Sequence, residues 1–212
     1  MKVDYTLYLV TDRSCMRAST LADAVKQAII GGCTMIQLRE KNSFASYFYD
    51  LALEIKQVTD YYEVPLIIND RVDIAMAVGA AGVHIGQSDL PAGTVRKIIG
   101  REMLLGVSVS SVGQAQKAVN DGADYLGVGA MFPSETKTDA VRVSIEELRQ
   151  IRRMAQLPIV VIGGICKENV GQFAAMGIDG LAAVSAILMQ DNISLAAAEL
   201  KSLFYLHRSQ DL

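Results

Sequence analysis

The residues of this chain that could do chemistry are gathered in seven polar clusters, each just after a short apolar run. The clusters are residues 37–41, 69–71, 84–89, 108, 134–137, 163–164 and 184–185. They hold carboxylates, cations, hydroxyls and paired glycines, and groups of these kinds bind phosphorylated ligands in proteins. The recurrence predicts that a repeated structural element delivers all of the clusters to one place.

Apolar runs that alternate with segments of helical spacing indicate what this repeated element is. The expected strands are residues 7–10, 35–38, 65–68, 82–85, 104–109, 125–128, 159–162 and 180–184. Between them, apolar residues recur at helical intervals, as in residues 21–29 and again in residues 170–174. Short β-branched runs that alternate with amphipathic helices are typical of parallel βα units.

We therefore expect an α/β fold, a (β/α)8 TIM barrel that forms a single domain over residues 1–212. A chain that is 51% hydrophobic can bury one sizeable core at this length. An open doubly wound sheet is the rival architecture, but no GxGxxG motif follows the first expected strand. In a barrel, every strand end points to one mouth, where the long loop 129–143 would form a lid.

Charge and cysteine usage narrow the class of protein further. The net charge of −3 provides no general field for nucleic acid or an anionic membrane, so neither is an expected partner. No apolar run approaches the roughly 18 to 20 residues of a membrane span. The three cysteines, Cys15, Cys33 and Cys166, have no CxxC spacing, and the N-terminus lacks a signal-peptide pattern. These features favour a reduced, cytoplasmic setting.

Eight motifs follow the expected strands in order. They are LYLVTD at 7–12, QLREK at 37–41, INDR at 68–71, GVHIGQSDL at 82–90, GVS at 106–108, FPSETK at 132–137, GGI at 163–165 and VSAI at 184–187. Together they resemble the thiamine-phosphate synthase family over nearly the whole chain. The resemblance implies a barrel enzyme that joins a pyrimidine methyl diphosphate to a thiazole phosphate and releases pyrophosphate with Mg²⁺, by a dissociative mechanism.

The resemblance also assigns two sets of ligand-binding residues. The pyrimidine diphosphate set is Gln37, Leu38, Arg39, Glu40, Lys41, Asn69, Ser108 and Lys137. Within it, the expected catalytic residues are Arg39, Lys41, Ser108 and Lys137. The thiazole phosphate set is Ser134, Glu135, Thr136, Gly164, Val184 and Ser185.

The spacing at the end of the second expected strand agrees with this assignment. Gln37, Arg39 and Lys41 alternate along the chain, so their side chains extend on one side. Arg can bind phosphate oxygens in pairs, and Lys acts as a point charge. Glu40 would then face away and pair with a neighbouring cation.

Asp70 and Asp89 are the expected ligands of Mg²⁺. Pyrophosphate is a poor leaving group unless its charge is neutralised as it departs. The two aspartates follow neighbouring strands, which lie about 5 Å apart, so both could reach one ion. Mg²⁺ takes one or two carboxylates together with phosphate oxygens and water. The structural alternatives are a helix cap at Asp70 and a turn at Asp89.

Other interpretations stay open at this stage. A serine bonded to backbone, a tight turn and a core histidine are the structural alternatives for Ser108, Gly163-Gly164 and His84. A thiazole tautomerase-like paralogue would share the fold and would need His84 as a general base. A non-catalytic barrel could bind a phosphorylated ligand as a sensor. Small-molecule substrates are the expected partners, with a homo-oligomer as an option.

Overall fold

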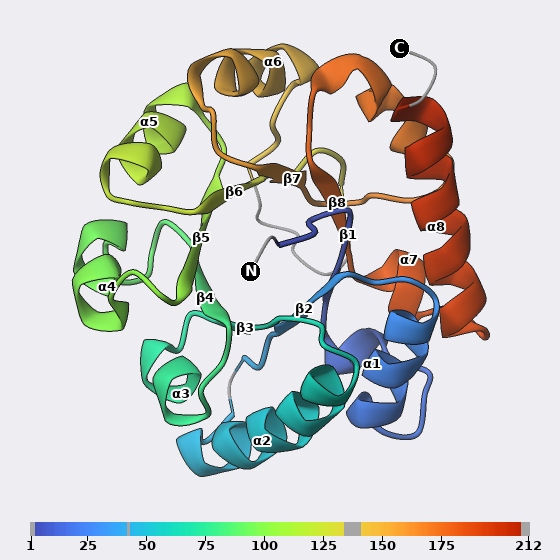
Figure 1. The fold of residues 1–212 in the computed structure, drawn as a ribbon. Coiled ribbons are helices and arrows are strands. Elements are labelled where there is room, and N and C mark those ends of the chain that lie inside the picture. The colour runs from blue at the N-terminus through green and yellow to red at the C-terminus, as the bar shows by residue number, and fades with distance from the viewer. Residues whose placement is uncertain (1–2, 42, 134–140, 209–212) are drawn as a thin grey trace.

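The computed structural model describes residues 3–41, 43–133 and 141–208, which form a closed barrel of parallel strands (Figure 1). The strands are β1 (Leu7–Val10), β2 (Met35–Leu38), β3 (Leu66–Asn69), β4 (Gly82–Ile85), β5 (Leu104–Val109), β6 (Tyr125–Val128), β7 (Ile159–Val161) and β8 (Gly180–Ala183). Each strand pairs with the next one along the chain, and β8 pairs with β1. The expected (β/α)8 barrel is confirmed.

Helices surround the barrel and cover the outer faces of the strands (Figure 1). The α-helices are α1 (Leu21–Ile30), α2 (Ala45–Tyr61), α3 (Val72–Ala77), α4 (Ala92–Ile99), α5 (Val112–Asn120), α6 (Ile145–Met154), α7 (Ser185–Leu188) and α8 (Ile193–Arg208). Two 3-10 helices, η1 (Arg13–Cys15) and η2 (Val170–Met176), complete the set among the described residues. Hydroxyl caps start α1, α5 and α6, where Thr20, Ser111 and Ser144 each accept a backbone N–H three residues on.

The structure differs from the sequence prediction at a few boundaries. The third strand begins and ends one residue later than expected, and β7 and β8 each end one residue earlier. Residues 170–174 form part of the 3-10 helix η2 and no α-helix. Ala175 departs from helical geometry there (φ −86°, ψ 21°), and Gly177 follows in the left-handed conformation. An interior glycine, Gly171, also weakens an α-helix in this short segment.

The strands bury one face toward the helices and the other inside the barrel. Along β1, Leu7 and Leu9 belong to the large cluster that packs against the helices. Tyr8 and Val10 belong to a smaller interior cluster, which also contains Tyr125 of β6. This alternation follows from the two-residue period of a strand, and it gives the barrel a filled interior.

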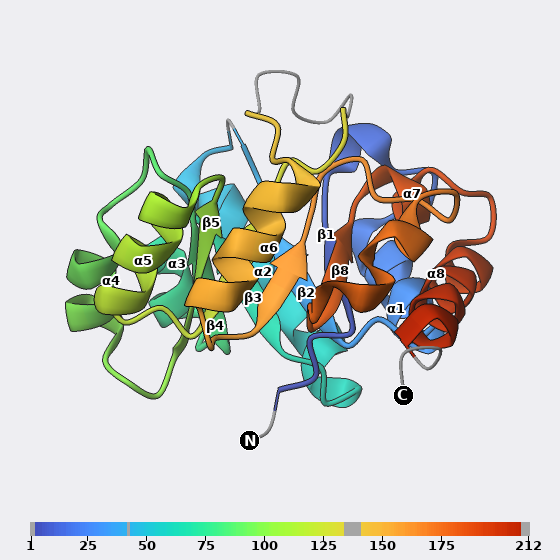
Figure 2. The same ribbon diagram turned by 90° about the horizontal axis from the view of Figure 1, so that it is seen from above.

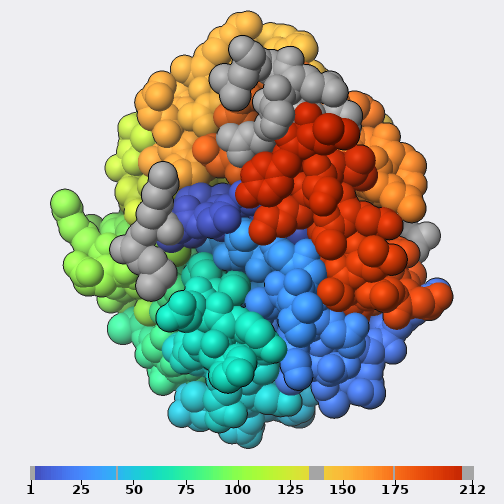
Figure 3. Space-filling view, turned by 45° about the vertical axis from the view of Figure 1, so that its right-hand side comes forward, coloured from blue at the N-terminus to red at the C-terminus, as the bar shows by residue number. Residues whose placement is uncertain are grey.

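The two ends of the barrel are built differently. Loops that follow the strands gather at the top of Figure 2, together with η1, whereas both termini lie at the bottom. The N-terminal segment, dark blue in Figure 3, is seated between the surrounding elements on that face. Val3 and Tyr5 pack against the interior cluster, and the Tyr5 ring centroid lies 5.3 Å from that of Tyr125. The N-terminal segment therefore covers the lower end of the barrel interior.

None of the helices in the described part of the chain has the length and apolar character needed to span a membrane.

Candidate active site

A cavity of about 460 Å³ occupies the end of the barrel where the strands finish, and we call it the rim cavity. Among the residues that line it are Gln37, Arg39, Lys41, Asn69, Asp70, Asp89, Ser108, Gly164, Val184 and Ser185. All of these were expected at a ligand site from the sequence. The barrel thus brings together, around one space, side chains from strands far apart along the chain.

Some expected residues are not part of this lining. Leu38 is fully buried in the cluster between the strands and the helices. The Glu40 carboxylate accepts hydrogen bonds from Arg13 Nε (2.8 Å) and Nη2 (2.9 Å). The geometry gives neither residue a contact with a ligand in the rim cavity. Ser134, Glu135, Thr136 and Lys137 lie outside the described residues, together with residues 138–140 of the expected lid.

Asp70 sits at a backbone position that side chains rarely adopt. Its φ is +61°, in the left-handed region, and its N–H donates to the His84 carbonyl (2.8 Å). Helix α3 has Arg71 at its N-cap and no side-chain cap bond, so the Asp70 carboxylate does not serve as a helix cap. Such backbone conformations concentrate at functional sites, where the surrounding structure holds them in place.

The Asp89 carboxylate lies beside that of Asp70. Burial raises the pKa of Asp89, and the neighbouring Asp70 raises it further, although a hydrogen bond from the Gly86 N–H (2.7 Å) opposes the shift. That bond also means that Asp89 shapes its own turn, as the structural alternative expected. Two carboxylates held together in this way favour a divalent cation between them.

The donor set at this position fits Mg²⁺. Within the described ranges, no group of three or more His, Cys, Asp or Glu side chains could hold a metal ion. A two-carboxylate site suits Mg²⁺, which keeps several waters and takes phosphate oxygens as its other ligands. Zinc sites, by contrast, use three or four nitrogen, sulfur or carboxylate ligands.

The two expected cations are paired with carboxylates at the rim. Lys41 forms an ion pair with Asp70, and Arg39 Nη1 lies 3.1 Å from Asp12 Oδ2. The backbone N–H of Arg39 also donates to Thr11 Oγ1 (3.0 Å), which fixes the end of β2. Both cations line the rim cavity, so an anionic ligand there would meet two positive side chains.

Asp12 was expected only as the last residue of the motif at 7–12, without a role, and Arg13 was not expected, although both follow β1. Arg13 holds Glu40 and also stacks over the Tyr47 ring, with its guanidinium carbon 5.0 Å from the ring centroid. Asp12 holds Arg39. The signal that could have identified them is their place directly after the first strand, where a barrel puts functional residues.

A hydrogen-bonded chain of side chains crosses the barrel interior beneath the rim cavity. Gln37 Nε2 donates to the Tyr8 hydroxyl (2.8 Å), which lies 2.9 Å from the Tyr125 hydroxyl. His84 Nδ1 lies 3.0 Å from the Tyr125 hydroxyl, and its Nε2 lies 2.9 Å from Ser108 Oγ. His84 is therefore a hydrogen-bonded interior histidine, as expected, and Ser108 is held by a side chain.

Gly163 and Gly164, after β7, both have positive φ angles, 98° and 61°. A Cβ on Gly163 would come within 2.6 Å of the Ala130 Cβ, and one on Gly164 within 2.5 Å of the Pro133 carbonyl oxygen. Conformation and close packing of the loop after β6 therefore both require glycine here. The bare backbone also lines the rim cavity at Gly163 and Gly164.

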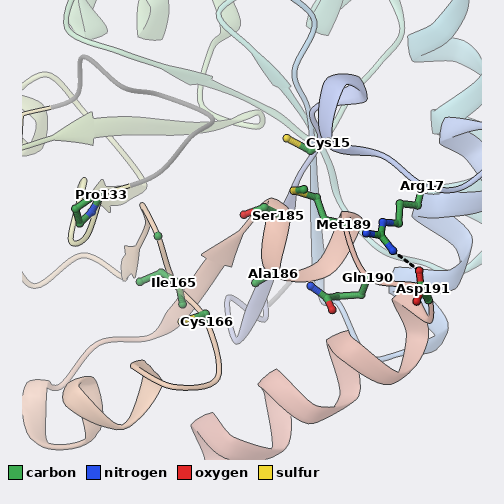
Figure 4. A pocket seen from close by; sticks show the side chains of 11 residues that line it. Cys15, Arg17, Pro133, Ile165, Cys166, Ser185, Ala186, Met189, Gln190 and Asp191 are labelled. Atoms are coloured by element: carbon green, nitrogen blue, oxygen red, sulfur yellow. Dashed lines mark hydrogen bonds and ion pairs between the residues drawn. The ribbon is translucent and has the colours of Figure 1, made fainter.

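A second cavity, of about 550 Å³, adjoins the rim cavity and shares Gly164, Ile165 and Ser185 with it. Figure 4 shows its lining, with the Arg17–Asp191 ion pair on one side. Cys15 and Cys166 both line this space. The shared residues make the ends of β7 and β8 the boundary between the two cavities.

The barrel architecture recurs in proteins of low sequence identity. The structure of a 3-hexulose-6-phosphate synthase matches with a TM-score of 0.67 at 16% identity, covering 93% of this chain and 99% of that one. Such a match shows a shared fold alone.

Other comparisons are much closer in sequence. A thiamine-phosphate synthase of Clostridium beijerinckii is 58% identical over 203 residues, 96% of this chain and 97% of that protein. One of Ruminiclostridium cellulolyticum is 57% identical over 203 residues, with the same coverage of 96% and 97%. The structure of a thiamine phosphate pyrophosphorylase from Pyrococcus furiosus matches with a TM-score of 0.89 at 35% identity, covering 97% of this chain and 98% of that one.

The family model for thiamine monophosphate synthase matches residues 7–187, which span all of the strands and the whole rim cavity lining. This match agrees with the resemblance expected from the eight motifs. With relatives this similar over nearly its full length, the chain is an enzyme of the transferase class and belongs to the thiamine monophosphate synthase family.

Proposed function

We propose that this enzyme joins a pyrimidine methyl diphosphate to a thiazole phosphate, giving thiamine phosphate and pyrophosphate in a reaction that depends on Mg²⁺. The observation that carries the proposal is the pair of neighbouring carboxylates, Asp70 and Asp89, which share the rim cavity with Lys41 and Arg39. Closely similar relatives are named for this product. Two carboxylates beside two cations suit a metal-bound diphosphate.

The departure of pyrophosphate is the step that most needs help from the protein. Asp70 and Asp89 would hold Mg²⁺, which neutralises charge on the diphosphate when bound. Arg39 and Lys41 would bind the diphosphate oxygens, exchanging their present carboxylate partners for the ligand. By the resemblance, Lys137 joins them from the loop after β6. The developing negative charge would then meet fixed positive groups.

The pyrimidine ring would lie deeper in the cavity, over Gln37, Asn69 and Ser108. These residues offer both donors and acceptors, and the first two are buried. The thiazole phosphate would bind at Gly164, Val184 and Ser185, and by the resemblance also at Ser134, Glu135 and Thr136. A dissociative reaction needs no protein nucleophile, so positioning and charge stabilisation are the protein's task.

The geometry supports the tautomerase hypothesis less well than the synthase proposal. That reaction needs a general base, and His84 is the candidate. Both ring nitrogens of His84 lie within 3.0 Å of hydroxyl groups in the barrel interior, at Tyr125 and Ser108. A histidine engaged in this way suits a supporting role. A sensor, in turn, would have no need of paired metal carboxylates beside two cations.

A cytoplasmic location and self-association stay predictions. The structure joins none of its three cysteines in a disulfide, which agrees with a reducing compartment.

The test uses the purified full chain with both substrates and Mg²⁺, and it measures pyrophosphate and thiamine phosphate in parallel. We expect both products in equal amounts, and we expect chelation of the metal to abolish them. Thiazole phosphate binding without any product would contradict the proposal and favour the tautomerase or the sensor.

A further inference from the structure

Five side chains inside the barrel form one continuous chain of hydrogen bonds, and the direction of donation along it can be assigned. It runs from Gln37 on β2 through Tyr8 on β1 and Tyr125 on β6 to His84 on β4 and Ser108 on β5. Its two ends line the rim cavity, as do Tyr8 and His84, whereas Tyr125 is fully buried below it. The chain therefore links two expected ligand contacts that lie on strands three apart around the barrel, β2 and β5.

The direction of the protons follows from the Gln37 end. The amide Nε2 can only donate, so the Tyr8 oxygen is an acceptor there. Among the described residues, the Tyr8 proton then has one acceptor, the Tyr125 oxygen. Tyr125 in turn donates to His84 Nδ1.

This arrangement fixes the state of the other end. With Nδ1 as an acceptor, neutral His84 carries its proton on Nε2 and donates it to Ser108 Oγ. The Ser108 proton is left to point into the rim cavity, which Ser108 lines. In the reverse direction, the Tyr8 oxygen would accept two bonds, and its own proton would have no acceptor within the described ranges. An unmet buried donor makes that direction the costlier one.

The surrounding backbone is shaped to make room for this chain. A Cβ on Gly106 would come within 2.3 Å of both the Tyr125 hydroxyl and His84 Nδ1. A Cβ on Gly127 would lie 2.9 Å from the His84 Cε1. Burial also holds the pKa values of both Tyr8 and Tyr125 well above the usual range, so both hydroxyls keep their protons. The glycines on β5 and β6 therefore accommodate one specific contact.

We propose that Tyr8, Tyr125 and His84 are positioning residues, which hold a one-directional hydrogen-bond chain across the barrel. The chain would turn the Gln37 carbonyl oxygen and the Ser108 proton toward the ligand in the rim cavity. It thereby presents one fixed acceptor, on β2, and one fixed donor, on β5, to the same ligand. The identity of that ligand as the pyrimidine diphosphate rests on the proposed function.

The tautomer of His84 tests the chain directly. The protein has two histidines, so long-range ¹H–¹⁵N spectra of histidine-labelled protein contain two ring systems, and His207→Gln assigns them. We expect the His84 proton on Nε2 in the wild type and a mixture of tautomers in Tyr125→Phe. A proton on Nδ1, or on both nitrogens, in the wild type would overturn the proposal, as would an unchanged tautomer in Tyr125→Phe.

Tyr5→Phe is the matched control. Its ring packs against Tyr125, but its hydroxyl is not a member of the chain. We expect the His84 signals of this variant to match those of the wild type. If Tyr125→Phe does not fold, Tyr8→Phe breaks the chain one step further from His84, and the wild-type spectrum decides in either case.

Kinetics add a readout that general structural damage would not give. In Tyr8→Phe and Tyr125→Phe, kcat/KM for the pyrimidine diphosphate should fall about 10- to 100-fold, the cost of misplaced contacts, while KM for the thiazole phosphate is unchanged. A rise in KM for the thiazole phosphate in Tyr8→Phe or Tyr125→Phe, or the same loss of kcat/KM in Tyr5→Phe, would overturn the positioning role. A wild type that makes no thiamine phosphate would count against the proposed function alone, because the spectra use no substrate.

Discussion

The charged side chains at the two ends of the barrel differ in the partners that they have. At the lower end, Asp124 precedes β6, accepts the Leu105 N–H (2.7 Å) and pairs with Arg96 of α4. The guanidinium of Arg96 also donates to the carbonyls of Gly100 (2.6 Å) and Gly122 (3.0 Å). Every charge in this cluster therefore has partners within the protein.

The same arrangement recurs two strands further along. Asp179 precedes β8, accepts the Ile159 N–H (2.8 Å) and pairs with Arg152 of α6 (3.2 Å). Arg152 also donates to the backbone carbonyl of Ala155. In both copies, one aspartate ties the start of a strand to a helix, which is a structural use of charge.

At the rim, Lys41 pairs with Asp70 and Arg39 with Asp12, but two carboxylates also lie side by side there. Asp70 has a left-handed backbone, and Asp89 lies half-buried beside it with a raised pKa. Neither feature stabilises the folded chain by itself. The lower end therefore pairs each of its charges within the protein, whereas the rim keeps one carboxylate beside another, an arrangement that a bound cation would stabilise.

The largest expected effect is at the rim. Asp89→Asn should reduce turnover at least about 100-fold, a size seen for single electrostatic groups in active sites. The free energy of unfolding should not fall. Because the folded pKa of Asp89 is raised, its ionised form costs stability above that pKa, and the neutral amide removes this cost.

The matched control is Asp73→Asn, on α3 at the same end of the barrel. Asp73 is largely exposed and pairs with Arg71 two residues away. We expect its turnover to stay near the wild-type value. Normal turnover in Asp89→Asn, or a clear loss of stability, would break the contrast between the two ends.

The lower end should show the opposite pattern. Asp124→Ala leaves the Leu105 N–H and the Arg96 guanidinium without this partner, so we expect the free energy of unfolding to fall by about 1 to 3 kcal/mol in urea titrations. Turnover per folded molecule should be unchanged. Asp121→Ala is the control, because Asp121 forms an exposed ion pair with Lys117 within α5 and its cap, and such pairs contribute at most about 1 kcal/mol. A large loss of turnover in Asp124→Ala would contradict a purely structural role.

Ligand should stabilise the protein through the rim alone. Pyrophosphate with Mg²⁺, at about 100 times its Kd, should raise the free energy of unfolding by about 2.7 kcal/mol in the wild type and in Asp124→Ala. Asp89→Asn should show no such gain at the same concentrations. Equal stabilisation of all three proteins would mean that the ligand binds elsewhere.

The smallest effect separates the two ends by thiol reactivity. Burial raises the pKa of Cys33, which lies between α1 and β2 at the lower end, to about 12, so almost none of it is thiolate near neutral pH. Cys15 and Cys166 are only half-buried and line the cavity next to the rim. A thiol reagent should modify these two in the native state and Cys33 only after unfolding. Rapid reaction of native Cys33 would contradict the closed lower end.

Much of the fold could be predicted because one strong signal repeats. β1, β2, β4, β5 and β6 have the expected bounds, since apolar runs closed by glycine or polar residues define them locally. The segment 170–174 was less predictable, because its apolar spacing suits an α-helix while Gly171 and Gly177 favour a tighter turn. Local pattern alone does not decide between these forms.

The residues that line the site could largely be predicted from the sequence, but the hydrogen bonds between their side chains could not. Residues such as Asp70 and Asp89 are identified by their place after neighbouring strands. The link between Tyr8 and Tyr125 joins β1 and β6, which are not neighbouring strands and whose residues are more than a hundred positions apart. No local periodicity carries that information, because it depends on which inward-facing side chains meet at one level of the closed barrel.

Calorimetric titration of pyrophosphate into the wild type and Asp89→Asn, with and without Mg²⁺, tests the central claim most directly. If the rim charges exist to hold a metal and an anion, the wild type binds pyrophosphate with Mg²⁺ present, binds it far more weakly without the metal, and loses this dependence in Asp89→Asn. Pyrophosphate binding that is equally tight without Mg²⁺, or unchanged in Asp89→Asn, would contradict it.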